Sequence, residues 1–97
     1  MKALAEIQVI PIGAGVSVRN EVKRAHQLIR DSGLKVQLHS YGTNVEGPLE
    51  DILSVIHKVH ETLHAEGVVR LSTSIKIGTR TDKDVSLEGK LFDPGST

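Results

Sequence analysis

The stretch that decides the fold is Gly42-Thr43-Asn44-Val45-Glu46-Gly47-Pro48, because it separates two segments with different hydrophobic periods. Before it, residues 34–41 alternate apolar and polar side chains, which is the pattern of a half-buried strand. After it, apolar residues from Leu49 to Leu63 recur every three or four positions, which indicates an amphipathic helix. The chain must turn between the two segments, and Glu46 lies where the strand pattern gives way to the helix pattern.

The segment before residue 34 predicts a strand followed by a helix. Residues 3–12 alternate as a strand, which Pro11 and Gly13 bring to an end. Ser17 is the expected N-cap of the helix that follows, and Gly33 supplies its stop. The expected apolar stripe of this helix consists of Val18, Val22, Ala25, Leu28 and Ile29.

The segment from residue 42 onward predicts one short strand, a long helix and a last strand. Residues 42–47 contain too many turn residues for a long strand, so we expect only residues 44–46 to pair with the preceding strand. Pro48 suits the first turn of the helix, which runs to about Glu66 with Gly67 as its expected C-cap. A last strand follows at 69–77, and residues 85–92 allow two helical turns.

This order of elements predicts an α+β fold for a single domain spanning residues 1–97. Strand, helix, strand, strand, helix, strand is the order of a ferredoxin-like βαββαβ sandwich, in which two helices cover one face of an antiparallel sheet. By strand alternation the other face carries mostly polar side chains, among them Gln8, Tyr41 and Ser72. We expect it to be a subunit interface with small polar pockets, since a domain this small gains from covering an open sheet; the alternative is a solvated surface.

Composition excludes several classes of function. The 12 basic and 12 acidic side chains balance, and one Tyr and one Phe leave few platforms for stacking bases, which argues against binding to nucleic acid or a membrane. With no Cys there is no disulfide, thiol nucleophile or thiolate metal site. Glu6 interrupts what would have to be an apolar signal core, so we expect a cytoplasmic protein.

No set of residues predicts catalysis or a metal site. His57, His60 and His64 lie at helical spacing, but an HExxH arrangement is absent and we interpret them as residues at a helix shoulder or interface. His26 and His39 are isolated in the sequence and are interpreted in the same way. No serine stands in a GxSxG context, so an enzyme that uses His and Glu ranks below a binding protein.

Two polar segments remain open to more than one interpretation. Glu46, beside Thr43 and Asn44, can accept hydrogen bonds from an amine or a ring N–H, or it can compensate the positive end of the following helix. The basic strand end at Arg80 and Lys83 can hold an anion, although we favour a solvated end or an ion-pair region.

Three segments resemble the small thiamine-binding family related to YkoF. They are Ile10-Pro11-Ile12-Gly13 with Ser17-Val18, then Gly42-Thr43-Asn44-Val45-Glu46-Gly47, then Ser74-Ile75-Lys76-Ile77 through Arg80, Asp82 and Lys83. The resemblance covers nearly the whole chain and implies a ferredoxin-like subunit that packs sheet to sheet into dimers and tetramers, with no established catalysis. Family members often continue into a longer C-terminal helix, whereas this chain meets Pro94-Gly95.

The resemblance implies that Thr43 and Glu46 contact thiamine or its pyrimidine, with Ser17 a weaker candidate. Strand alternation adds Gln8, Tyr41 and Ser72 to the candidate ligand-binding residues. The leading hypothesis is a non-enzymatic, oligomeric protein that binds thiamine or a related aminopyrimidine and needs no cofactor or metal. The alternative is a self-assembly module, structural or regulatory, without a small ligand.

Overall fold

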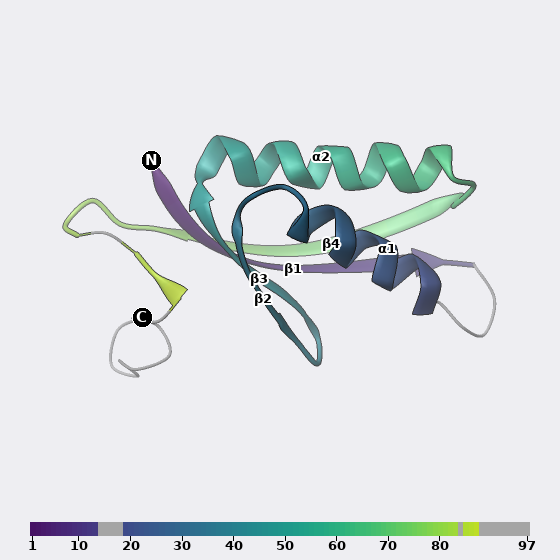
Figure 1. Ribbon diagram of the computed structural model, residues 1–97, viewed down its shortest axis with the longest axis horizontal. Helices are drawn as coiled ribbons and strands as arrows, with labels where there is room; N and C mark the ends of the chain where they lie inside the picture. The colour runs from purple at the N-terminus through teal and green to yellow at the C-terminus, as the bar shows by residue number, and fades with distance from the viewer. Residues whose placement is uncertain (14–18, 84, 88–97) are drawn as a thin grey trace.

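The ferredoxin-like α+β fold is confirmed by the structure, a computed structural model that describes residues 1–13, 19–83 and 85–87. Its elements, shown in Figure 1, are β1 (Lys2–Ile12), α1 (Arg19–Arg30), β2 (Lys35–His39), β3 (Gly42–Pro48), α2 (Leu49–Ala65) and β4 (Arg70–Thr79). The four strands form one antiparallel sheet in the order β2-β3-β1-β4.

The core lies between the two helices and one face of the sheet. Side chains alternate along each strand, so odd-numbered residues of β1 and β3 point to the helices while even-numbered ones point away. The buried cluster consists of Ala3, Ala5, Ile7, Ala25, Ile29, Val45, Ile52, Val55, Val59 and Leu63. Both apolar helix stripes expected from the sequence contribute to it, so hydrophobic burial fixes how the helices lie on the sheet.

Strand β3 is longer than the sequence patterns predict. The expectation of a brief strand at 44–46 is wrong, because the whole segment from Gly42 to Pro48 pairs with its neighbours. The two glycines serve close packing. A Cβ on Gly42 would lie 2.6 Å from the backbone carbonyl oxygen of Ile7, and one on Gly47 would meet the side chain of Leu34. Pro48 is the N-cap of α2, one position before the first turn where it was expected.

The end of α2 forms as the sequence predicts. Gly67 has φ +106°, a left-handed conformation that glycine adopts without strain, and the backbone N–H of Val68 donates back to the carbonyl of Leu63. This hydrogen bond satisfies a carbonyl group at the end of the helix, after which the chain continues to β4.

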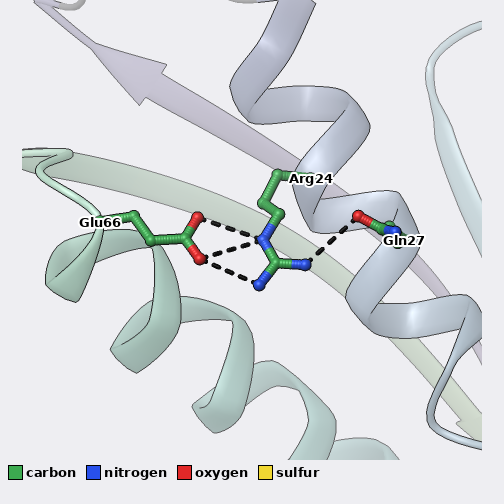
Figure 2. A network of polar contacts seen from close by, with 3 residues as sticks. All are labelled: Arg24, Gln27 and Glu66. Carbon is green, nitrogen blue, oxygen red and sulfur yellow. Dashed lines mark hydrogen bonds and ion pairs between the residues drawn. The ribbon is translucent and has the colours of Figure 1, made fainter.

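A polar network joins the two helices where α2 ends. The guanidinium of Arg24 on α1 donates from Nε and Nη2 to the carboxylate of Glu66, and from Nη1 to Gln27 (Figure 2). Hydrogen bonding to Glu66 raises the pKa of Arg24 above its ordinary value. All three side chains contact solvent, so this network fixes the orientation of Arg24 more than it stabilises the fold.

The sheet face opposite the helices is partly covered by the chain itself. Val85 and Leu87, which follow β4, pack against Leu4 in a second buried cluster. In Figure 1 this segment lies on the side of the strands away from α2. The face expected to be open is therefore covered at Leu4, near the start of β1, while the predicted helical turns beyond Leu87 lie outside the described residues. None of the described helices is long and apolar enough to cross a membrane.

We predict that Gly42→Ala destabilises the protein and that Gly78→Ala does not. The new Cβ at Gly42 must displace backbone of β1, an overpacking cost of about 1–3 kcal/mol in the free energy of unfolding. Gly78 is the matched control, since it also lies in a strand, its Cβ would meet nothing within 4 Å, and its φ is not positive. Urea unfolding of both variants measures the difference, and equal stability would contradict the close approach.

Candidate functional site

A cavity of about 280 Å³ lies where β1 and β3 stop pairing. The β1–β3 pairing ends at Ile7 and Thr43, whereas the β1–β4 pairing continues to Ile12 and Arg70. This difference leaves a notch beside β1, which α1 and the turn between β2 and β3 enclose. The lining residues are Ile7, Gln8, Val9, Ile10, Pro11, Val22, His26, Ile29, Leu38, His39, Ser40, Tyr41, Gly42 and Thr43.

Thr43 and His26 supply the polar groups at the base of this cavity. Thr43 faces the helices and is 4% exposed, the one buried polar residue among those described. Its hydroxyl oxygen lies 3.4 Å from Nδ1 of His26. A hydroxyl both donates and accepts, and an imidazole nitrogen does either according to its tautomer, so the pair can serve a ligand with mixed donors and acceptors.

Apolar side chains surround the mouth of the cavity and remain exposed. Val22 is 42% exposed, Leu38 59%, Ile10 41% and Tyr41 77%. These residues come from α1, β2, β1 and the turn between β2 and β3, so tertiary structure alone brings them together. An apolar rim around convergent polar groups is the usual character of a small-molecule site.

His39 fixes the turn that carries Tyr41. Its Nδ1 accepts a hydrogen bond from the backbone N–H of Tyr41 at 3.2 Å, so the ring proton is on Nε2 when the imidazole is neutral. Nε2 lies 3.3 Å from a carboxylate oxygen of Glu6, a contact without hydrogen-bond geometry, and has no other partner among the described residues. By the strand register Glu6 and His39 lie on the same face of the sheet, the one away from the helices.

Glu46 lies on the opposite face of the sheet from Thr43. Residues three apart in a strand point to opposite sides, and the register places Glu46 beside Leu4. Its carboxylate accepts a hydrogen bond from the backbone N–H of Leu87 at 2.9 Å and lies 3.9 Å from Nζ of Lys2. Glu46 therefore holds the segment after β4 against the sheet, and the structure does not bring it together with Thr43.

The other candidate residues from the sequence fall into three groups. Gln8 and Tyr41 line the cavity with Thr43. Ser72 lies opposite Ile10 in the register, on the face of the sheet away from the helices. Ser17 lies outside the described residues.

Two histidines line the cavity but were not predicted as site residues, His26 and His39. For His26 the sequence contains a signal, because this residue lies one helical turn after Val22, on the apolar stripe of α1.

The three histidines of α2 have separate partners. His57 contacts Glu61, His60 contacts the hydroxyl of Thr73, and Nδ1 of His64 contacts the carbonyl oxygen of Val68. Among the described residues no group of three His, Cys, Asp or Glu side chains is arranged to hold a metal ion.

The basic strand end is an ion pair within the chain. Nη2 of Arg80 lies near a carboxylate oxygen of Asp82, 2.6 Å away, and hydrogen bonding to Arg80 lowers the pKa of Asp82 to about 2. Both groups are at the surface, so the interaction is local and weak.

The sequence is similar to a family described as "Thiamine-binding protein", whose profile matches residues 5–93. A UPF0045 protein of Synechocystis is 35% identical over 91 residues, which cover 94% of this chain and 75% of that protein. A UPF0045 protein of Methanocaldococcus jannaschii is 39% identical over 90 residues, covering 93% of this chain and 89% of that protein.

Solved structures are similar over nearly the whole chain. A hypothetical protein of Methanocaldococcus jannaschii superposes with a TM-score of 0.88 at 38% identity, covering 99% of this chain and 98% of that one. A Thermotoga maritima protein, described as a candidate thiamine biosynthesis or salvage protein, gives 0.84 at 22% identity, covering 94% and 96%. The second likeness supports the fold alone.

We predict that Glu46→Ala releases the segment after β4. Loss of a hydrogen bond to a charged acceptor is expected to lower the free energy of unfolding by about 1.5–3 kcal/mol. Amide hydrogen exchange at Leu87 should accelerate more than exchange in β1. Glu46→Gln is the matched variant, because its amide oxygen can still accept from Leu87 and should retain part of the protection. Unchanged exchange at Leu87 in Glu46→Ala would contradict this role.

Proposed function

This chain belongs to the thiamine-binding protein family, and we propose that it binds the aminopyrimidine portion of thiamine, without catalysis, in the cavity beside Thr43. The single observation that carries the proposal is the position of Thr43 and His26. Their polar atoms are next to one another in a cavity whose lining is mostly apolar.

The size of the cavity favours a single ring. Its volume of about 280 Å³ is just below the roughly 300–1,000 Å³ that small-molecule sites span. A pyrimidine ring fits such a space with its flat faces against the apolar lining from Ile7, Val9 and Ile29. The thiazolium of intact thiamine would lie toward the mouth, where the exposed ring of Tyr41 can contact its positive charge.

The chemistry of the pyrimidine matches the polar groups at its base. An aminopyrimidine presents an exocyclic amine as donor and ring nitrogens as acceptors. The hydroxyl of Thr43 and the imidazole of His26 can each donate or accept, so together they satisfy one group of each kind. Gln8 and Tyr41 stay in the proposal as lining residues, whereas Glu46 and Ser72 are assigned no contact with the ligand.

The surroundings of His26 favour binding over catalysis. The pair of Thr43 and His26 has the elements of a nucleophile and a base, but among the described residues no carboxylate contacts His26 to orient its ring. The family description refers to thiamine binding, and the relatives from Synechocystis and Methanocaldococcus jannaschii carry only the designation UPF0045.

We predict that Thr43→Val weakens binding of the hydroxymethyl aminopyrimidine of thiamine by about 5- to 30-fold, the loss of one or two hydrogen bonds. Isothermal titration measures the dissociation constant. Ser72→Ala is the control, because it also removes one hydroxyl from a strand but on the opposite face of the sheet. The melting temperature of each variant without ligand shows whether the fold is intact.

The proposal has two contradicting outcomes. If the wild-type protein gives no heat and no rise in melting temperature with either thiamine or the free pyrimidine, no such ligand binds. If Ser72→Ala weakens binding as much as Thr43→Val, the ligand is not in this cavity.

A second function, self-assembly, is favoured by the far end of the sheet face. Ile10 and Ile12 are 41% and 37% exposed there, beyond the part of β1 that Val85 and Leu87 cover. We propose that copies of the chain associate through this uncovered end of the face. We expect light scattering to give the mass of a dimer or tetramer at micromolar concentration, and a monomer at all concentrations would contradict it.

A further inference from the structure

A groove along α1 adjoins the cavity beside Thr43. The two share the lining residues Val22, His26 and Leu38, so they lie side by side on the surface. The groove has a volume of about 520 Å³ and is wider than the cavity. Its remaining lining residues are Asn20, Lys23, Arg24, Gln27 and Arg30.

The groove carries cationic side chains that differ in how far they are neutralised. Arg24 is held by Glu66 at 2.9 Å, so its charge is balanced. Arg30 has a looser contact, 4.0 Å from Asp31. Lys23 is exposed, and within the described part of the chain no carboxylate pairs with it. The groove therefore offers a ligand the ammonium of Lys23 and the guanidinium of Arg30, whose charge is only partly balanced by Asp31.

No acidic side chain lines either the cavity or the groove in the described part of the chain. A positively charged thiazolium would meet cations along α1, and the carboxylates near them, Glu66 and Asp31, already contact Arg24 and Arg30. An anionic group would meet Lys23 and Arg30, and it could also accept hydrogen bonds from Asn20 and Gln27. Of two ligands with the same pyrimidine, the charges of the groove therefore favour the one that carries an anionic group over the one that carries a cationic thiazolium.

We propose that this site prefers a phosphate ester of the aminopyrimidine, with the ring beside Thr43 and the phosphate in the groove at Lys23 and Arg30. This inference rests on the proposed function, since it assumes that the cavity takes the ring. It adds the ligand class: an anionic pyrimidine phosphate in preference to the free pyrimidine or to cationic thiamine.

The expected preference is modest and sensitive to salt. Both cations are exposed, so each contributes weakly, and we expect the ester to bind about 3- to 10-fold more tightly than the free pyrimidine at low salt. Exposed charges are screened at high ionic strength. The advantage of the ester should therefore shrink between 20 mM and 500 mM salt, while binding of the free pyrimidine stays constant.

The test is isothermal titration of the full chain with four compounds: the free hydroxymethyl aminopyrimidine, its phosphate ester, thiamine and inorganic phosphate. We predict that Lys23→Glu removes the preference for the ester and leaves the affinity for the free pyrimidine unchanged. Lys58→Glu is the control, because Lys58 is an equally exposed lysine on α2 that lines neither the cavity nor the groove. If Lys23→Glu does not fold, Lys23→Gln and the salt series on the wild type test whether the preference for the ester depends on charge.

Each outcome supports or overturns the inference. Preference for the ester that Lys23→Glu abolishes and Lys58→Glu retains supports it. Equal or weaker binding of the ester than of the free pyrimidine overturns it while the proposed function stands. Equal binding of the ester and inorganic phosphate, without binding of the free pyrimidine, shows an anion site alone and overturns both. No binding by any pyrimidine overturns the proposed function, and this inference with it.

Discussion

The rest of the structure depends on one constraint: β1 pairs antiparallel with two strands, and one of them pairs along less of β1 than the other. β4 follows β1 to its end, whereas β3 stops at the level of Ile7, where Gly42 allows the backbones to approach so closely that a Cβ would collide with a carbonyl. Because the β2–β3 hairpin ends there, β1 is left with one unpaired side. α1 covers this gap without filling it, and the candidate site is the space that remains.

The same pairing gives the side chains of residues 42–48 two different roles. In β3, Thr43 faces the helices and contacts His26, while Glu46 faces away and holds the backbone of Leu87. A carboxylate that accepts a hydrogen bond from a chain segment 41 residues away stabilises tertiary structure, and it is not available to a ligand on the other face. Charge around the cavity therefore comes from α1, although the whole chain is neutral.

Much of the fold can be predicted from the sequence, and most of the site cannot. The order of elements, the apolar stripes of both helices and the helix stop at Gly67 follow from local periodicity and glycine placement. The predicted length of β3 was too short, because Gly42 and Gly47 were interpreted as turn residues. In the structure these glycines allow close packing within the sheet and against Leu34. Once residues 42–48 are known to be a strand, alternation alone separates Thr43 from Glu46.

By itself the sequence determined which elements form, which face of each is apolar and that the chain carries no net charge, since these depend on residues close together in the chain. Only the tertiary structure decided that Thr43, His26 and Tyr41 surround one cavity and that Glu46 belongs to another surface. Those contacts are fixed by strand register and by where a helix lies on the sheet. Both depend on packing among residues distant in the chain, which no local pattern records.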